Sequence, residues 1–352
     1  MPNRSSSIRA AAFAGLFIAT FAVSFYLLQQ RGARQDPEPN LVSDTSGLIE
    51  PSDLSYLQSY HHYLRLDHGV DYRVETSSGN RDIDTYAAQR FSDLRIGADG
   101  EPGRGLLLVI DPDQDLVRLE VGYGLEGVFP DAFIAYVEER QMVPFFRRGR
   151  VSDGIVATTE LLITRIQNAK ANAGFEDEVW LEGSGGAGAR TKARLGQPDT
   201  GPAPRHADVD AATTPEATLA AYMDAMRTRN ASTELSIYSV ATRAMLANWV
   251  TTSAQMDNVA RSYLSCDATP AIFSQASDFA VIRYRIEDRQ CAPWFFTFEN
   301  DRWRLDLTMM QEAIRFGRGN AWRLVPGVEH PYAFAFDDWS FDRNGFPVQR
   351  NR

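Results

Sequence analysis

The amino-acid sequence predicts an α/β sandwich, then a smaller α+β domain, behind one N-terminal transmembrane helix. Between residues 40 and 170, short runs with the two-residue period of strands alternate with helical-period segments, a pattern typical of α/β domains. From residue 213 onward the helical segments come first and the strand-like runs follow. A length of 352 residues suits two or three domains.

The N-terminal segment determines the expected location. Ala10 to Leu28 is mostly apolar and uncharged, and at about 1.5 Å per residue it spans nearly all of the ~30 Å hydrocarbon core. We therefore expect residues 1–30 to be an uncleaved, single-pass anchor in the cell membrane. A cleaved signal peptide is the alternative, but no small-x-small cleavage site directly precedes the polar flank at Gln29. Arginines flank both sides, so charge alone does not set the orientation.

The predicted first domain, residues 40–170, contains three strands and four helices. The expected helices are a segment from Pro51 to Leu64, Asp82–Leu94, Asp131–Arg140 and Ser152–Gln167, and the expected strands are Val70–Thr76, Leu106–Ile110 and Leu116–Val121. The helix between the first two strands makes them parallel, whereas the short Asp111–Asp115 turn makes the third strand antiparallel. These elements give a small mixed sheet with flanking helices.

The stretch after the third strand is the most specific signal. Gly122, Gly124 and Gly127 permit a tight turn, and Glu126 and Asp131 flank it. Because Asp131 precedes an apolar-periodic run, we expect it to be the N-cap of the next helix. That structural role, without any ligand, is an equally weighted alternative for Asp131.

This stretch also carries a family resemblance. Gly122-Tyr-Gly-Leu-Glu-Gly127 with Pro130-Asp131 resembles the TPM-domain family, which includes thylakoid-lumen acid phosphatases and photosystem II repair proteins. Ile96-Gly97 and Pro144-Phe-Phe-Arg-Arg-Gly149 fit the same pattern, and the resemblance extends roughly from Asp44 to Asn168. It implies domains on the extracytoplasmic side of the membrane, and it implies divalent-cation binding.

The topology predicts which acids lie together. Glu126 and Asp131 should lie at the same end of the sheet as the Gly97–Gly103 loop, which carries Asp99 and Glu101. Such loops offer the oxygen ligands that Ca²⁺ prefers. The Asp111–Asp115 turn should lie about 20 Å away, at the other end.

The predicted metal ligands are Glu126, Asp131, Asp99, Glu101 and Asp44, and calcium is the favoured ion. Asp44 matches the family's early aspartate, so the resemblance places it in this set. Simple solvation is the alternative for Glu126, Asp99 and Glu101. Arg104 stands where the family usually has asparagine, and its charge could weaken metal binding or replace it through an ion pair.

The remainder of the chain contains a predicted linker and a second domain. Residues 174–212 are rich in glycine, proline and polar residues, so we expect a flexible linker. Residues 213–312 loosely resemble the NTF2-like cone fold, with a hairpin turn at Glu299–Arg302. We expect the aromatic tail, residues 313–352, to pack on this domain because so many exposed rings would promote aggregation.

Two cysteines, Cys266 and Cys291, lie in the second domain. In an oxidising compartment they could form a disulfide that stabilises the fold by about 3 kcal/mol in the chain-entropy model. Two buried free thiols are the alternative. Neither cysteine has a CxxC partner, which argues against zinc.

These features favour a non-enzymatic envelope protein. Its TPM domain would bind a divalent cation and partner proteins in membrane-protein assembly or repair. The net charge of −10 argues against a nucleic-acid partner. The enzymatic alternative is a metal-dependent phosphoric monoester hydrolase, with Arg104, Arg147 and Arg148 as candidate phosphate contacts, but no nucleophile motif accompanies them. The third possibility is a small ligand in the cup of the cone domain, among Tyr222, Trp249, Tyr284 and Trp294.

Overall fold

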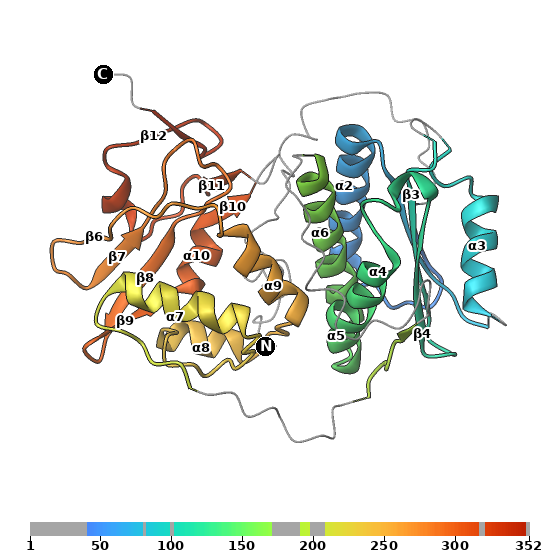
Figure 1. Cartoon of the computed structure of the whole chain (residues 1–352), viewed down its shortest axis with the longest axis horizontal. Helices are drawn as coiled ribbons and strands as arrows, with labels where there is room; N and C mark the ends of the chain where they lie inside the picture. The colour runs from blue at the N-terminus through green and yellow to red at the C-terminus, as the bar shows by residue number, and fades with distance from the viewer. Residues whose placement is uncertain are drawn as a thin grey trace, which may run out of the picture. The chain divides into compact units, whose positions relative to one another are not determined.

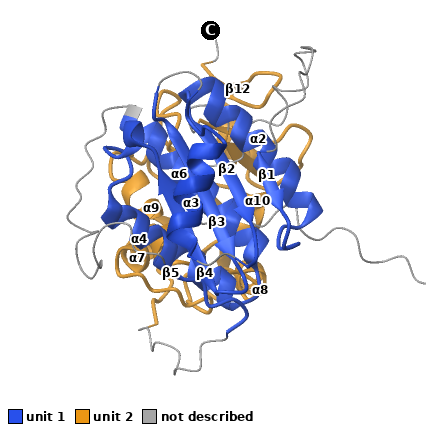
Figure 2. Ribbon diagram, turned by 90° about the vertical axis from the view of Figure 1, so that its right-hand side faces the viewer, with its two compact units in different colours: residues 1–11, 25–201 blue, residues 12–24, 202–352 orange. Residues whose placement is uncertain are grey.

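A computed structural model describes residues 41–79, 82–98, 102–170, 191–197, 208–316 and 321–349. The chain divides into two compact units, and the boundary between their main parts lies between residues 201 and 202 (Figure 2). The expected anchor, residues 1–30, lies outside the described residues. Within the described ranges, the search for a helix long and apolar enough to cross a membrane found none.

The first unit is built on a mixed sheet that has five strands within the described residues. The strands are β1 (Val42–Asp44), β2 (Asp71–Thr76), β3 (Gly105–Asp111), β4 (Leu116–Val121) and β5 (Thr191–Lys192), in that order across the sheet. β1, β2 and β3 are parallel, and β4 is antiparallel to β3 and β5. The predicted mixed sheet is therefore confirmed, and β3 is buried along its whole length, as expected of a central strand.

Helices cover both faces of this sheet. They are α2 (Pro51–His68), α3 (Ile83–Asp93), α4 (Asp131–Val137), α5 (Val143–Arg147) and α6 (Val151–Lys170), with a π-helical turn, η2 (Glu138–Met142), between α4 and α5. Figure 1 shows α3 on one face and α2, α4, α5 and α6 on the other. The layers are those of an α/β sandwich.

Helices α2 and α6 run parallel and are joined by polar contacts along their length. Ser152 donates a hydrogen bond to Asp53 near both N-termini (2.5 Å), and Tyr60 donates to Glu160 in the middle (2.5 Å). Near the C-termini the Gln167 amide donates to the Tyr63 hydroxyl (2.6 Å). Both helices therefore end at the same end of the sheet, where β2 and β3 begin.

Strand β5 was not predicted, since it lies within the range 174–212 that we expected to be a linker. The backbone N–H of Ala193 donates to the carbonyl of Asp115 (2.8 Å), and that of Leu195 donates to the Asp115 carboxylate (2.7 Å). β5 thus extends the sheet of the first unit, and the residues after it are hydrogen-bonded to Asp115. The predicted helix over 131–140 is also interrupted, because η2 replaces its last turn.

The second unit contains a four-stranded antiparallel sheet among the described residues. Its elements are α7 (Pro215–Arg227), α8 (Val240–Leu246), α9 (Ser253–Ser262), β6 (Ile272–Phe273), β7 (Phe279–Ile282), β8 (Trp294–Glu299), β9 (Arg302–Leu305), α10 (Leu307–Ala313), β10 (Ile314–Phe316), β11 (Trp322–Leu324), η5 (Ala333–Phe336), β12 (Ser340–Phe341) and β13 (Pro347–Val348). The expected hairpin is present: Glu299 pairs with Arg302, and both Asn300 and Asp301 have positive φ, as a type I′ turn requires.

Helix α8 of the second unit is short. It covers only Val240–Leu246, because the preceding residues lie extended along the edge of β9. There the N–H of Leu305 donates to the carbonyl of Ile237 (2.8 Å), and the N–H of Ser239 donates to the carbonyl of Leu305 (2.9 Å). The segment therefore pairs with a strand edge instead of continuing the helix.

Aromatic residues dominate the core of the second unit. Trp294 packs against Tyr222 and Tyr263, with ring centroids 5.2 and 4.8 Å apart. On the other face of the sheet, Tyr332 from the C-terminal tail stacks on Phe295 at 4.3 Å. Trp322 and Phe336 of the tail are buried in the same core, so these rings of the predicted aromatic tail are not left in solvent.

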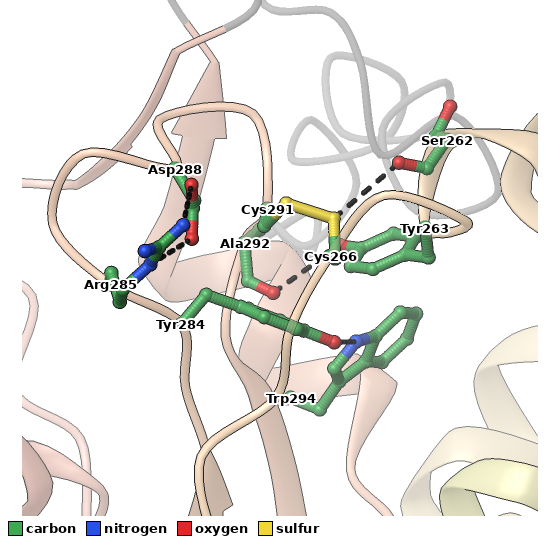
Figure 3. Close-up of a disulfide and its surroundings, with 9 residues drawn as sticks. All are labelled: Ser262, Tyr263, Cys266, Tyr284, Arg285, Asp288, Cys291, Ala292 and Trp294. Carbon is green, nitrogen blue, oxygen red and sulfur yellow. Dashed lines mark hydrogen bonds and ion pairs between the residues drawn. A yellow bond between two sulfur atoms is a disulfide. The ribbon is translucent and has the colours of Figure 1, made fainter.

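The two cysteines form a disulfide in the structure. Cys266 and Cys291 are bonded, with their Cα atoms 5.9 Å apart, and no free cysteine exists (Figure 3). The bond ties the segment after α9 to the segment before β8. Next to it the Tyr263 hydroxyl donates to the carbonyl of Ala292 (3.3 Å), so the cross-link adjoins the aromatic core.

Candidate functional site

Two glycine-rich loops meet at the end of the first unit's sheet where β3 begins and β4 ends. The N–H of Gly122 donates to the carbonyl of Gly105 (2.9 Å), and that of Gly124 donates to the carbonyl of Gly103 (3.0 Å). A Cβ at Gly122 would lie 2.3 Å from the Gly103 carbonyl oxygen, closer than any real contact. Glycine is therefore required there by the close approach of two backbones.

The two ends of the Gly97–Gly103 loop are held by backbone hydrogen bonds. Gly97 and Gly103 both have positive φ, and the N–H of Gly103 donates to the carbonyl of Gly97 (3.1 Å). The N–H of Gly97 donates in turn to the Asp71 carboxylate at the start of β2 (3.2 Å). The ends of this loop thus lie beside Gly122 and Gly124, as the topology predicted. Asp99 and Glu101 themselves lie outside the described residues.

Glu126 and Asp131 are both exposed at this end of the sheet. No hydrogen bond or ion pair joins either carboxylate to another residue within the described part of the chain. The expected N-cap role of Asp131 is wrong: Pro130 is the N-cap, and Asp131 is the first residue of α4 without a capping side-chain hydrogen bond. Pro130 has an extended backbone, with φ −63° and ψ 154°, so the helix begins one residue later, at Asp131.

A buried arginine fixes the segment between these two acids. Arg165 of α6 donates a hydrogen bond from Nε to the carbonyl of Val128, and its guanidinium lies 4.0 Å from the Phe133 ring centroid. Residues 128–133 are therefore attached to the long helix α6. The sequence did not reveal this role, because an arginine near the end of a helix usually lies in solvent.

Tyr123 is the other conspicuous residue of this end. Its side chain is 70% exposed, and its ring lies over Gly103, where an added Cβ would come within 2.5 Å of a ring carbon. A large aromatic side chain thus stands on the surface between the two loops. The glycine beneath it leaves room for the ring.

Asp44 does not lie with Glu126 and Asp131. It ends β1 opposite Thr76, at the end of the sheet where β3 passes into β4. Its two carboxylate oxygens accept hydrogen bonds from the N–H groups of Leu48 and Ile49 (2.9 Å each) and from the Thr76 hydroxyl. About six strand residues, or ~20 Å, separate this end from Glu126, so Asp44 staples a turn and is remote from the other predicted ligands.

The Asp111–Asp115 turn is structural as well. Asp111 is buried and accepts from the N–H groups of Asp113 (3.0 Å) and Gln114 (3.1 Å), and Asp115 accepts from the N–H of Leu195 (2.7 Å). These hydrogen bonds agree with the prediction that residues 111–115 form a turn. Among the residues that the structure describes, no group of three or more His, Cys, Asp or Glu side chains is arranged to hold a metal.

Two buried glutamates lie outside the predicted set. Glu138 of η2 accepts hydrogen bonds from the Leu119 N–H and the Thr191 hydroxyl (2.8 Å each), and burial raises its pKa to about 7. Glu160 accepts a hydrogen bond from the Tyr60 hydroxyl, and burial raises its pKa to about 8. Glu138 thus accepts a hydrogen bond from a backbone N–H of β4, as the carbonyl of a neighbouring strand would.

Two of the candidate phosphate contacts, Arg104 and Arg147, have structural partners, and His61 is buried. Arg104 donates to the carbonyl of His68 (3.2 Å), and Arg147 donates to the carbonyl of Gln197 (3.3 Å). His61 is buried against Tyr72 with ring centroids 4.9 Å apart, and burial lowers its pKa to about 3. None of these contacts aligns a nucleophile with a base.

The side chains expected to line a cup belong to the hydrophobic core of the second unit. Tyr222, Trp249, Tyr284 and Trp294 are all buried. The Trp294 Nε1 donates to the Tyr284 hydroxyl (3.1 Å), as Figure 3 shows, and the Tyr222 ring packs on Trp294. These four side chains thus pack against the core rather than lining an open cavity.

Comparisons with known proteins identify the first unit. No curated protein matches the chain. A solution NMR structure of the N-terminal domain of a protein from P. gingivalis is 28% identical, covers 37% of this chain and 83% of that chain, and has a TM-score of 0.34. The family model of the TPM domain matches residues 42–165, the range that contains both glycine loops, Glu126 and Asp131. This part of the chain is a TPM domain.

Proposed function

We propose that the TPM domain binds a divalent cation, with Ca²⁺ favoured, at the end of the sheet that carries residues 122–131. Partner proteins in membrane-protein assembly or repair would bind at the same end. The observation that carries the proposal is the contrast between a rigid backbone and available acids. The loops are locked together at Gly103, Gly122 and Gly124, whereas Glu126 and Asp131 are exposed without a side-chain partner among the described residues.

The chemistry of the donors suits a hard cation. Ca²⁺ takes six to eight oxygen ligands, including carbonyls and waters, and tolerates irregular geometry. Glu126 and Asp131 would supply two carboxylates, and Asp99 and Glu101 would supply the others from the neighbouring loop. Asp44 has no part in this proposal because it lies at the opposite end of the sheet.

Calcium titration of the full chain tests the cation site. We expect Ca²⁺ to raise Tm and to give a saturable calorimetric signal that the double variant Glu126→Gln/Asp131→Asn abolishes. A cation present at ten times its Kd stabilises the folded state by about 1.4 kcal/mol. Asp113→Asn, an exposed acid at the other end, is the matched control and should bind Ca²⁺ like the wild type. Equal binding by the double variant would place the site elsewhere.

The same proposal places the folded units outside the cytoplasmic membrane, tethered by residues 1–30. The Cys266–Cys291 disulfide supports this location, because disulfides persist mainly in oxidising compartments. Protease added to intact spheroplasts should then degrade both units, whereas a cytoplasmic protein would be protected.

Metal-dependent phosphoric monoester hydrolysis is the second candidate, favoured only by activities known in the TPM family. It needs a metal-bound water or a nucleophile, and the described residues include no nucleophile aligned with a base. Hydrolysis of para-nitrophenyl phosphate that requires Ca²⁺ and disappears in Asp131→Asn would establish it. We expect no turnover above that of the variant.

Small-ligand binding by an NTF2-like cone domain is the third candidate. Helices followed by an antiparallel sheet support the resemblance, but the packed rings of Tyr222, Tyr284 and Trp294 argue against a cup. We therefore propose that the second unit acts through its surface.

A further inference from the structure

Two phenylalanines of the second unit are exposed beside one buried tryptophan. Phe273 of β6 is 47% exposed and Phe298 of β8 is 41% exposed. Trp303 of β9, which is 5% exposed, lies between them, with ring centroids 5.3 Å from Phe273 and 5.1 Å from Phe298. We call these three rings the aromatic platform. Two exposed phenylalanine rings held against one tryptophan are a candidate interaction site.

The backbone beneath the platform is held rigidly. Phe298 and Trp303 are directly opposite each other in the β8–β9 hairpin. The N–H of Trp303 donates to the carbonyl of Ala212 (3.0 Å), and its carbonyl accepts from the Thr218 hydroxyl (2.9 Å). A partner would therefore lose little affinity to ordering the platform.

Carboxylates surround the platform. Exposed Glu216 accepts a hydrogen bond from the Ala271 N–H, two residues before Phe273 (2.8 Å). Exposed Asp278 adjoins Phe298, whose N–H donates to its carbonyl (2.9 Å), and exposed Asp301 lies on the hairpin turn. Arg302, an exposed cation, lies on the same turn. An apolar centre with a charged rim is the usual anatomy of a binding surface, and here the rim is acidic.

Elsewhere in the same unit, one of its own arginines lies between an aromatic ring and a carboxylate. The Arg283 guanidinium lies 4.5 Å from the Trp339 ring centroid and donates hydrogen bonds of 2.6 and 2.7 Å to the Asp338 carboxylate. The platform offers the same two groups, aromatic rings and carboxylates. Across the described ranges, no guanidinium lies over the rings of Phe273, Phe298 or Trp303.

We propose that the aromatic platform is a docking site for an arginine-containing segment of a partner polypeptide. The guanidinium would stack on Phe273 or Phe298 and pair with Asp278 or Asp301 at the rim. Cation–π stacking and charge pairing both favour arginine over lysine. The net charge of −10 would accelerate the approach of a basic segment. This proposal does not depend on the cation site of the TPM domain.

Fluorescence anisotropy with labelled twelve-residue peptides tests the proposal on the full chain. The probes alternate leucine with arginine, lysine or glutamate. We expect the arginine peptide to bind at least tenfold more tightly than the glutamate peptide and more tightly than the lysine peptide. Phe273→Ala/Phe298→Ala should weaken arginine-peptide binding at least tenfold, whereas Leu264→Ala, which removes a 77% exposed side chain in the same unit, should not.

A second variant protects the test against misfolding. Asp278→Asn/Asp301→Asn keeps every ring and should also weaken binding, with a smaller dependence of affinity on salt. Equal affinity for the glutamate peptide, no arginine-peptide binding up to about 1 mM, or full binding by a folded Phe273→Ala/Phe298→Ala variant would overturn the proposal. A dimer in sedimentation that Phe298→Ala dissociates would also overturn it, because the occupant would then be a second copy.

Discussion

The two ends of the TPM-domain sheet both carry acids, but the acids differ in what they contact. At the end where β3 passes into β4, the carboxylates of Asp44, Asp111 and Asp115 accept hydrogen bonds from backbone N–H groups. At the other end, Glu126 and Asp131 have no such donors among the described residues. The sequence alone does not separate these two groups. The positions of the hydrogen-bond donors separate them. Acids whose carboxylate oxygens accept backbone hydrogen bonds hold turns, whereas acids without such donors remain available to bind a ligand.

The largest effect should follow from breaking the backbone contact between the two glycine loops. Gly122→Ala places a Cβ 2.3 Å from the carbonyl oxygen of Gly103, and a backbone group cannot move aside cheaply. We expect a loss of about 3 kcal/mol in the free energy of unfolding, measured by urea denaturation. Gly127→Ala is the matched control, because nothing lies within 4 Å of its added Cβ. Similar stability of the two variants would show that the loops are not locked.

The second-largest effect concerns the end of the sheet where the carboxylates accept backbone hydrogen bonds. Asp44→Ala removes the acceptor for two backbone N–H groups and the Thr76 hydroxyl. Hydrogen bonds to a charged group contribute about 1.5–3 kcal/mol, so we expect unfolding to become easier by about 2 kcal/mol. Calcium affinity should not change. A variant of normal stability that binds Ca²⁺ poorly would reverse the roles of the two ends.

The sequence predicted the framework of the TPM domain much better than the roles of its acids. β4 has the predicted bounds, Leu116–Val121, because its alternation is regular and glycine ends it. β5 was missed because two residues in a polar, glycine-rich stretch carry no periodic signal. Its position depends on Glu138 and Asp115, which are distant in the sequence.

The sequence around Asp44 contains a local pattern that indicates its role in a turn. Asp44-Thr-Ser-Gly47 is an Asp followed by small polar residues and a glycine of positive φ, which is typical of a side-chain-stapled turn. The family resemblance pointed instead to a ligand. Contacts between residues far apart in the chain, such as Arg165 with Val128, left no comparable local pattern.

The third effect comes from acids in the interior, which belong to neither end. Burial raises the pKa of Glu160 to about 8, above the usual value of 4.5. Between these two values the folded state holds a proton that the unfolded chain has lost. The protonated form stabilises the folded state fully below pH 4.5, and this contribution is lost as the pH rises through 8. Between about pH 7 and 9 we expect a loss of about 1.4 kcal/mol of unfolding free energy. His61 does not contribute in that range, since both states hold it neutral there.

Glu160→Gln should remove most of this pH dependence, because glutamine keeps a hydrogen-bonding group for Tyr60 without titrating. Urea denaturation at several pH values measures the slope. Glu126→Gln is the control, since it changes an exposed acid and should leave the slope as in the wild type. An unchanged slope in Glu160→Gln would mean that another group, with Glu138 the first candidate, carries the dependence.

The smallest effect should be that of Asp131→Asn without metal. Asp131 is in the first turn of α4, where a negative charge interacts favourably with the helix dipole by about 0.3–1 kcal/mol when exposed and unscreened. It makes no capping bond, so the variant should lose about 0.5 kcal/mol or less in urea denaturation at physiological salt. With saturating Ca²⁺, the difference between the variant and the wild type should grow, because only the wild type gains the binding energy. A large loss without metal would make Asp131 a structural acid like Asp44, and the contrast between the two ends of the sheet would then disappear.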